Sequence, residues 1–510
     1  MAEPFYITTP IYYVNDKPHI GHAYTTLACD VLARFKRLDG YDVKFLTGTD
    51  EHGQKVQAAA TKAGVTPQHF TDNVSQNFRD LTDRMNFSND QFIRTTDPRH
   101  YESCQKLWSR LIEKGFIRLG KYAGWYSVRD EAFYTETELV NGKAPTGADV
   151  EWVEEPSYFF ALSEFQQPLL DFYEANPDFI APASRRNEIV SFVSSGLKDL
   201  SVSRTTFDWG VPVPGDDEHV MYVWLDALTN YITALDWQSD SDAYDKFWPA
   251  NLHMVGKDIL RFHAVYWPAF LMAADLPLPQ RVFAHGWWTN EGEKISKSLG
   301  NVIDPLALID EFGLDQTRYF MLREVPFGRD GDFARSAMIG RINSDLANDL
   351  GNLSQRTLSI IVKNLAGIMP EVPESPSAED TALLAQADSL INAVRADFDV
   401  QAFHEGLKRI WEVVAAANRY IDQQAPWALK KTDPDRMAQV LAVIAEVVRQ
   451  VGILVQPVMP GSAAQLLDQL GVAEDERGFD RVGGGTRLAG GRQIEAPKGV
   501  FPRFVEPQAE

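Results

Sequence analysis

Cysteine is almost absent from this sequence. The chain has 510 residues and only two cysteines, Cys29 and Cys104. Two thiols cannot build a disulfide framework, and they are too few for a zinc site made of three or four cysteines. Unpaired cysteines in a chain of this length are typical of a reducing cytosol. We therefore expect a cytoplasmic protein without structural zinc.

Basic residues are also scarce, and no long apolar run is present. The chain has 49 lysines and arginines against 71 aspartates and glutamates, a net charge of −22. This excess of acid argues against a nucleic-acid coat or a protein of anionic membrane surfaces, although a local patch could still meet a nucleic acid. The apolar stretch from Val440 to Pro460 contains Glu446 and Arg449, and residues 1–5 do not resemble a secretory leader. We expect a soluble protein that does not cross a membrane.

The remaining composition, with 45% hydrophobic and 24% charged residues, is that of a globular protein. A chain of this length suggests about three domains. Disorder as the main state, collagen and coiled coil are excluded.

The first 50 residues have the pattern of a strand, a helix and a second strand. Strand-like runs cover residues 5–9 and 43–47, and apolar residues recur at helical spacing from His19 to about Lys36. This pattern is a βαβ unit and predicts a parallel sheet. Ligands bind such sheets beyond the strand carboxyl ends, near the first βα turn. We therefore expect site residues between 10 and 22 and at Asp50.

Later segments differ in composition and in sequence pattern. Residues 115–214 are rich in aromatics, acids and turns, which indicates an inserted subdomain. Strand-like runs resume at 220–224, 252–255 and 282–285, as expected for the second half of the sheet. Amphipathic helical stretches then follow at 335–365, 376–398, 402–425 and 434–456. The fold class is α/β: a Rossmann-like parallel sheet (1–114 and 215–330) interrupted by an insert (115–214) and followed by an all-α domain (331–510).

The tetrapeptide His19-Ile20-Gly21-His22 opens the first predicted helix. His19 and His22 share one helix face, and the helix N-terminus offers N–H groups and a positive dipole end to phosphate. Gly21 lacks a Cβ, so a flat purine can lie against the backbone. Taken alone, these residues also fit a second interpretation, a turn that caps the helix and contains the two histidines by chance.

A second motif, Glu293-Lys294-Ile295-Ser296-Lys297-Ser298, lies far along the chain. Two lysines three residues apart, with serines and a nearby Gly300, suit a loop that grips phosphates as point charges. Taken alone, a solvated surface loop is the simpler interpretation.

Together, the HIGH tetrapeptide and the KMSKS-like pentapeptide strongly resemble those of class I aminoacyl-tRNA synthetases. The stretches 8–15, 48–53, 222–227 and 255–259 further resemble the methionyl-tRNA synthetase family, and the resemblance runs from residue 5 to about 460. It implies ATP-dependent attachment of methionine to its tRNA through a methionyl-adenylate, with ATP, Mg²⁺, methionine and the initiator and elongator methionine tRNAs as partners.

The resemblance also implies roles for individual residues. His19, His22, Lys294 and Lys297 would be catalytic, and these four would bind ATP together with Gly21, Lys257 and Asp258. Asp50 would hold the amino group of methionine. The pocket would be lined by Pro10, Ile11, Tyr13, Trp224, Ala227, Leu228, Tyr231, Ile259, His263 and Trp267.

The residue types agree with those roles. A thioether favours aromatic edges, which Tyr13, Trp224, Tyr231 and Trp267 offer. A buried ammonium needs a carboxylate, and Asp50 lies at the carboxyl end of a predicted strand. Any one of these aromatics, taken singly, is more often part of the core than a ligand contact.

In the helical part, Asn348, Asn352 and Arg356 are spaced i, i+4, i+8, and Trp427 follows a separate helix. The resemblance implies that these four residues meet the anticodon, since unstacked bases are read by stacking and by hydrogen bonds to their edges. Without the resemblance, these residues would fit equally well a polar helix face on the surface and a Trp packed on the core.

Two departures from the family pattern matter. Many members carry cysteine zinc knuckles in the insert, but residues 125–131 contain no cysteine, so we expect a zinc-free form. The chain ends at Glu510 without an appended domain of the kind that dimerises some relatives, so we expect a monomer.

Other functions fit less well. The leucine, isoleucine and valine synthetases need a larger editing insertion, and the cysteine enzyme needs cysteine-bound zinc. A non-catalytic tRNA-binding paralogue would have lost His19, His22, Lys294 and Lys297. A small nucleotidyltransferase that shares the HIGH signature would not explain the helical domain with Asn352, Arg356 and Trp427.

Overall fold

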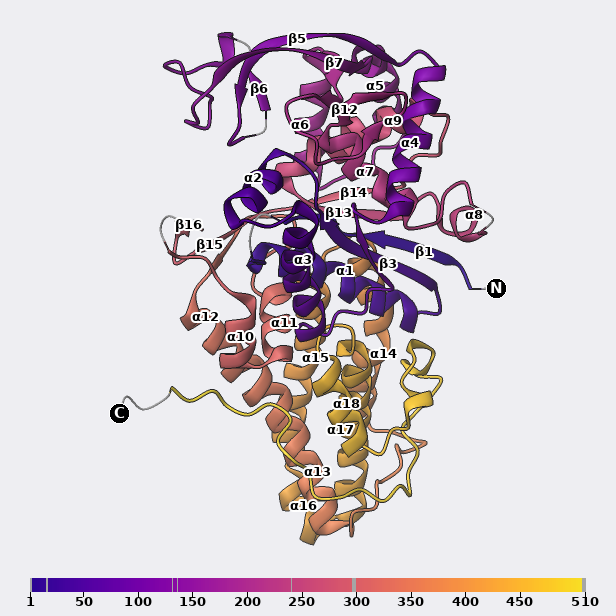
Figure 1. The fold of residues 1–510 in the computed structure, drawn as a ribbon. Coiled ribbons are helices and arrows are strands. Elements are labelled where there is room, and N and C mark those ends of the chain that lie inside the picture. The colour runs from indigo at the N-terminus through magenta and orange to yellow at the C-terminus, as the bar shows by residue number, and fades with distance from the viewer. Residues whose placement is uncertain are drawn as a thin grey trace. The chain divides into compact units, whose positions relative to one another are not determined.

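A computed structural model describes residues 2–14, 17–130, 132–134, 136–239, 241–295 and 300–506 (Figure 1). The chain divides into two compact units. The first comprises residues 1–29 and 42–285, and the second comprises residues 30–41 and 286–510.

The first unit is built on a parallel sheet in the order β2-β3-β1-β13-β14-β8, with β4 paired to β3. Every pair in it is parallel, which confirms the fold predicted from the βαβ pattern. Its inner strands are buried along most of their length, so they lack the regular alternation of apolar and polar residues that a half-exposed sheet shows. The strands are β1 (Pro4–Thr8), β2 (Tyr12–Tyr13), β3 (Asp42–Asp50), β4 (Gln91–Arg94), β8 (Ile180–Ala181), β13 (Leu252–Gly256) and β14 (Val282–His285).

Helices connect these strands. α3 and α4 begin at prolines, and the side chains of Thr66 and Asp97 cap their first turns, as helix starts favour. The helices are α1 (Ile20–Leu38), α2 (Gln54–Ala63), α3 (Pro67–Arg84), α4 (Pro98–Glu113), α5 (Gln166–Ala175), α6 (Ala183–Ser194), α7 (Val223–Thr233), α8 (Ala243–Phe247) and α9 (Trp267–Ala273). Shorter turns are η1 (Glu136–Glu138), η2 (Leu162–Phe165), η3 (Lys257–Ile259) and the π-helical η4 (Phe262–Tyr266).

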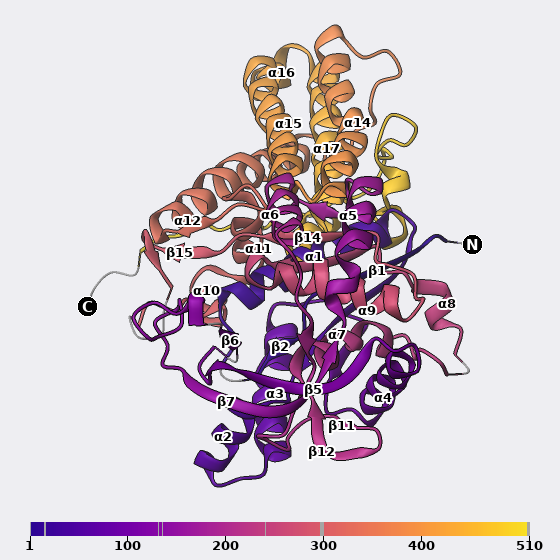
Figure 2. The ribbon, with the colours of Figure 1, turned by 90° about the horizontal axis from the view of Figure 1, so that it is seen from above.

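Two small antiparallel sheets accompany the main one. The larger has the order β6-β5-β7-β9, and Figure 2 shows β5 and β7 running side by side as one long curved ribbon. Its strands are β5 (Ile117–Ser127), β6 (Ala132–Tyr134), β7 (Glu151–Phe160) and β9 (Leu200–Ser201); the smaller sheet has β10 (Ser203–Arg204), β11 (Pro212–Val213) and β12 (Asp216–Met221). β8, although it lies within 115–214, joins the main sheet.

One sequence prediction is wrong. Residues 220–224 were expected to form a strand of the main sheet, but β12 ends at Met221 and pairs only with β10 and β11 among the described strands. Val223 and Trp224 begin α7 instead. A five-residue apolar run fits a buried strand and the start of a buried helix equally well, so periodicity could not separate them.

The second unit is mainly helical and confirms the predicted stretches. Figure 1 shows α14, α15 and α17 packed side by side. The predicted helix at 335–365 includes a π-helical segment, η6, which an α-helical pattern does not reveal. The elements are β15 (Trp288–Asn290), β16 (Glu293–Lys294), α10 (Pro305–Phe312), α11 (Leu314–Arg323), β17 (Gly331–Phe333), α12 (Arg335–Arg341), η6 (Ile342–Gly351), α13 (Asn352–Asn364), α14 (Ala378–Asp399), α15 (Phe403–Gln424), α16 (Pro426–Thr432), α17 (Pro434–Val455), α18 (Pro460–Gln469), η7 (Glu474–Glu476) and η8 (Phe479–Arg481).

The helix α17 is the core of this unit. By length and composition alone it is long and apolar enough to cross a membrane, which the sequence analysis did not expect of this stretch. However, 89% of its apolar stretch is buried inside the protein, as in the core helix of a soluble protein. Its buried Glu446 accepts two hydrogen bonds from Arg449 at 2.7 and 2.8 Å, so the charges that interrupt the run form an internal pair.

Candidate functional site

The HIGH tetrapeptide lies at the N-terminus of α1. The backbone N–H of Gly21 donates to Nδ1 of His19, and the backbone N–H of His19 donates to Nδ1 of His22, both at 3.0 Å. The two ring centroids are 3.9 Å apart. Because each ring uses Nδ1 as an acceptor, the proton of a neutral ring lies on Nε2, the nitrogen that can donate to phosphate.

The surroundings of the tetrapeptide hold these rings in place. His22 makes edge contacts with Tyr12 and Phe78, at centroid distances of 4.9 and 5.3 Å. A Cβ added to Gly21 would lie 2.9 Å from the His19 ring, so a larger residue there would displace the histidine. His19 therefore caps α1 through Nδ1. A role of its Nε2 as a phosphate donor stays a prediction.

The predicted pocket residues on α7, η3, η4 and α9 lie together. Nε2 of His263 is 2.6 Å from the Tyr231 hydroxyl, and Nδ1 is 2.9 Å from the Ile259 carbonyl. Trp267 is fully buried, 6.1 Å from the Tyr231 ring. Trp224 stacks on Phe262 at 3.3 Å between centroids, a partner that sequence reasoning missed.

Other predicted pocket residues join the same region less directly. Ile11, Trp224 and Ile259 pack against the core cluster that contains Leu228, Tyr231 and Trp267. Ala227 and Pro10 are buried, while Tyr13 packs on a neighbouring cluster with Tyr12. The assignment of all of these residues to substrate stays a prediction.

The electrostatics of His263 suit an apolar ligand. Burial lowers the pKa of His263 from 6.5 to about 4, against the opposing effects of the Ile259 carbonyl and Asp258. The ring is therefore neutral at pH 7: Nδ1–H donates to the Ile259 carbonyl, and Nε2 accepts a hydrogen bond from the Tyr231 hydroxyl. The pair of Tyr231 and His263 therefore places no charge among the predicted pocket residues.

This shift predicts an acid-sensitive fold. In the unfolded chain His263 takes up a proton near pH 6.5, but in the folded chain only near pH 4, so the free energy of unfolding falls as the pH drops through that interval. The His263 contribution lost between neutral pH and pH 5 is about 2 kcal/mol. Urea unfolding at pH 7.5 and 5.0 should show a pH dependence smaller by this amount in His263→Gln.

The exposed His69→Gln variant is the matched control for that comparison. If His263→Gln and the unmodified protein lost equal stability on acidification, His263 would not be the group that resists protonation.

Asp50 ends β3, and both it and the following residue are held by hydrogen bonds. Its backbone carbonyl accepts from Val14 at 3.1 Å, and its side chain is buried. The Glu51 carboxylate receives hydrogen bonds from Arg94, Thr49 and Thr96, all between 2.7 and 2.8 Å. The Asp50 carboxylate is therefore presented from a rigid strand end, as an ammonium anchor requires.

The fold also brings together a cluster that no sequence spacing predicted. His100, Cys104 and Asp226 place one potential metal ligand each within 4.8 Å of one another, all buried. These atoms already bond to each other: His100 Nε2 lies 2.8 Å from Asp226 and 3.3 Å from the Cys104 sulfur. Burial and the Asp226 carboxylate raise the pKa of the Cys104 thiol, which disfavours the thiolate that metal binding needs.

We expect the protein to hold no stoichiometric zinc. Three side chains that satisfy each other by hydrogen bonds offer fewer ligands than the four of a structural zinc site. Elemental analysis after dialysis against a chelator should find zinc well below one atom per chain, with an unchanged melting temperature. Retained stoichiometric zinc, or unfolding on chelation, would contradict this; loss of the metal in Cys104→Ser would then place it at this cluster.

The other residues predicted to bind ATP are only partly described. Lys257 and Asp258 follow β13 in the turn η3. Lys294 ends β16, which pairs with β15. Lys297 lies outside the described residues. These two lysines belong to the second unit, whereas His19 and His22 belong to the first.

The predicted anticodon residues lie on the helical unit. Asn348 is exposed in η6, and Asn352 is exposed at the start of α13. The guanidinium carbon of Arg356 lies 5.1 Å from the centroid of the Trp427 ring, and its Nη2 is 2.9 Å from Asp422. Trp427 is 49% exposed, so its ring is not part of the core.

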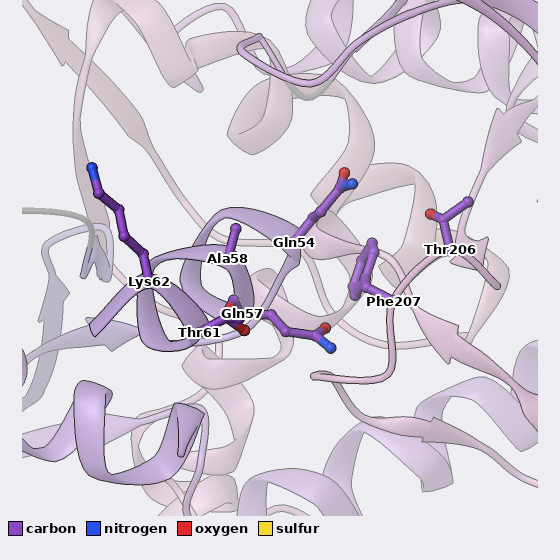
Figure 3. A pocket seen from close by; sticks show the side chains of 7 residues that line it. All are labelled: Gln54, Gln57, Ala58, Thr61, Lys62, Thr206 and Phe207. Atoms are coloured by element: carbon purple, nitrogen blue, oxygen red, sulfur yellow. The ribbon is translucent and has the colours of Figure 1, made fainter. Parts of the chain in front are cut away.

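A cavity of about 430 Å³ runs along α2. Figure 3 shows the side chains around it, which are mostly polar and do not include any predicted site residue. They are Gln54, Gln57, Ala58, Thr61, Lys62, Thr206 and Phe207.

Comparison with known protein families identifies two matching models. The model described as class I tRNA synthetases (M) matches residues 5–151 and 137–358. The model described as the anticodon binding domain of methionyl tRNA ligase matches residues 369–510.

Individual proteins are similar over the whole chain. A methionine–tRNA ligase of Rickettsia felis is 57% identical, with 99% of each chain covered, and one of Rhizobium meliloti is 59% identical, covering 100% of this chain and 99% of its own. Among solved structures, Mycobacterium tuberculosis methionyl-tRNA synthetase in complex with methionyl-adenylate is 54% identical with a TM-score of 0.95. That comparison covers 98% of this chain and 100% of the other.

Proposed function

Because the chain belongs to the methionyl-tRNA synthetase family, we propose how its residues share the steps of that reaction. The protein is a methionine–tRNA ligase of class I that uses ATP and forms methionyl-adenylate. The observation that carries this function is the full-length similarity to methionine–tRNA ligases at 57–59% identity, over both the α/β part and the helical part.

In the first step, the methionine carboxylate attacks the α-phosphorus of ATP and pyrophosphate leaves. No protein nucleophile is needed, so catalysis consists of positioning and of neutralising the charge that develops on phosphate. His19 and His22 would donate from Nε2 to phosphate, and Lys294 and Lys297 would meet the departing pyrophosphate. Mg²⁺ bound to ATP would supply further positive charge.

ATP binding would extend beyond these four residues. Gly21 would leave room for the purine, and Lys257 and Asp258 would lie near the nucleotide. The rigid end of β3 supports Asp50 as the anchor for the ammonium group.

The methionine side chain would lie in the neutral aromatic pocket. Tyr231, His263 and Trp267 would form its buried wall and Trp224 an adjustable one, since Trp224 is less buried and stacks on Phe262. The remaining lining would be Pro10, Ile11, Tyr13, Ala227, Leu228 and Ile259.

In the second step, the adenylate passes methionine to the terminal ribose of a methionine tRNA. Asn348, Asn352, Arg356 and Trp427 would read the anticodon. We propose a monomeric, cytoplasmic, zinc-free enzyme with the domain ranges 1–114, 115–214, 215–330 and 331–510, the last one binding the anticodon.

The test is amino-acid-dependent ATP–pyrophosphate exchange across all twenty amino acids, followed by charging of a tRNA with a CAU anticodon. Exchange should depend on methionine, and charging should follow it. Exchange driven best by leucine, isoleucine or valine would contradict the substrate, and tRNA binding without any exchange would indicate a non-catalytic paralogue.

A further inference from the structure

A chain of hydrogen bonds runs through the core of the first unit, behind the proposed methionine pocket. Nδ1 of His52 lies 2.7 Å from one oxygen of Asp226, and Nε2 of His100 lies 2.8 Å from the other. The chain continues to Tyr101 through His52 at 2.9 Å and to Thr233 through His100 at 3.2 Å. The side chains of His52, His100 and Asp226 are at most 2% exposed.

One end of this hydrogen-bond chain lies on α7, the helix that carries the proposed pocket wall. Four of the proposed pocket residues, spaced i, i+3, i+4, i+7, share one face of α7: Trp224, Ala227, Leu228 and Tyr231. Asp226 and Thr233 lie on the other face of α7, which packs against α4 and carries the hydrogen bonds to His52 and His100. The carboxylate therefore anchors the back of the helix whose front faces the substrate side chain.

The other end of the hydrogen-bond chain lies on the segment that carries Asp50, the proposed ammonium anchor. His52 follows Asp50 by two residues on the same rigid strand end. The indole N–H of Trp209 donates to the Glu51 carbonyl at 2.6 Å, and the Gly53 N–H donates to the Trp209 carbonyl at 3.0 Å. His52 is thus the point where this fixed segment is joined directly to α7.

The Asp226 carboxylate, at the centre of this hydrogen-bond chain, keeps its negative charge in the folded protein. Burial alone would raise the pKa of the Asp226 carboxyl, but the charge of His52 and the hydrogen bonds from His100 and His52 hold it well below its usual value. Both oxygens of this buried carboxylate are bonded to imidazoles, and the loss of either bond would leave a buried polar group unpaired. The carboxylate therefore acts as a joint that holds the two histidines in fixed positions.

We propose that Asp226 is a positioning residue for the amino-acid substrate. Its carboxylate holds His52, and with it the strand end that carries Asp50, at a fixed place relative to the pocket wall on α7. The joint would set the distance between the anchor for the ammonium group and the pocket for the thioether. This inference rests on the proposed function of Asp50 and of the α7 face.

The test compares two ligands in Asp226→Asn. Asparagine keeps the size but offers one acceptor oxygen instead of two, so one histidine loses its bond. The KM for methionine in pyrophosphate exchange should rise about 10- to 100-fold, while the KM for ATP and kcat change less than about 3-fold. The inhibition constant of 4-(methylthio)butanoate, which lacks the amino group, should change less than about 3-fold, because this ligand does not use Asp50.

Two further variants complete the design. His52→Gln should show the same contrast between the two ligands, and it serves if Asp226→Asn does not fold. Asp380→Asn is the matched control, because Asp380 is also a buried carboxylate with two bonds from one arginine, Arg436, but belongs to the second unit. It should leave the KM for methionine unchanged.

An equal loss of affinity for methionine and for the amino-free analogue would overturn the proposal, since Asp226 would then merely stabilise the pocket wall. Unchanged KM for methionine in both Asp226→Asn and His52→Gln would overturn it as well. Methionine-dependent exchange by the unmodified protein tests the proposed function separately.

Discussion

Replacing Lys297 with alanine is expected to lower the rate of methionyl-adenylate formation by a factor of about 10²–10³, with little change in methionine affinity. A lysine that meets its negative charge only as pyrophosphate separates stabilises the transition state more than the ground state, so the loss falls on kcat. At comparable electrostatic sites one such contact is worth roughly 3–4 kcal/mol. Single-turnover adenylate formation and equilibrium binding of methionine measure the two quantities separately.

The matched control is Lys408→Ala, which removes an exposed lysine that pairs with Glu405 in the second unit. It should leave both quantities unchanged. Unaltered exchange kinetics in Lys297→Ala would remove Lys297 from the mechanism, and a large loss of methionine affinity would show that it acts on binding rather than on the departing pyrophosphate.

The parts of the fold that follow from local chemistry could be predicted from the sequence. The βαβ start was predicted within a few residues, because β1 and the first half of β3 are rich in aromatic and aliphatic residues and α1 has a regular apolar face. The long helices of the second unit were predictable for the same reason. Residues 220–224 were assigned wrongly because a short apolar run has no period.

The tertiary partners in the site could not be predicted. His52 and Asp226 are 174 residues apart, and His100 and Asp226 are 126 apart, so no spacing relates them. A lone histidine or aspartate carries no signal of its own without such a partner. The stacking of Phe262 on Trp224 could not be predicted either, since Phe262 lies in the π-helical turn η4, which an α-helical pattern does not reveal.

The family motifs supplied what local chemistry could not. His19 and His22 resemble a capping turn on their own, and the structure shows that His19 does cap α1. The capping bond also fixes which ring nitrogen carries the proton of a neutral ring, so the capping role does not exclude the predicted role in phosphate binding. For Arg356 and Trp427, the sequence offered only a polar face and a Trp after a helix, and their proximity appears only in the folded unit.

Trp427→Ala and Arg356→Ala are expected to impair charging of methionine tRNA while leaving methionine activation intact. Trp427 is 49% exposed, with the Arg356 guanidinium 5.1 Å from its ring centroid. An exposed indole offers a face on which an unstacked base can lie, and this arginine can hydrogen-bond a base edge beside it. Base–aromatic stacking is worth roughly 1–3 kcal/mol, which corresponds to about a 5- to 150-fold loss of tRNA affinity.

The two variants should differ in salt dependence. If Arg356 also meets a phosphate, its removal lowers the slope of tRNA affinity against salt, whereas the loss of Trp427 leaves the slope unchanged. Arg409→Ala is the matched control, because Arg409 belongs to the same unit and, like Arg356, forms an ion pair with an aspartate, Asp397. The decisive measurement compares pyrophosphate exchange with charging of a CAU-anticodon tRNA in all three variants. Parallel loss in both assays would mean that the substitutions unfold the protein, and undiminished charging would mean that the anticodon is read elsewhere. The net charge of −22 sharpens this test, because a protein with an excess of acidic residues has few other contacts with tRNA to compensate for a lost one.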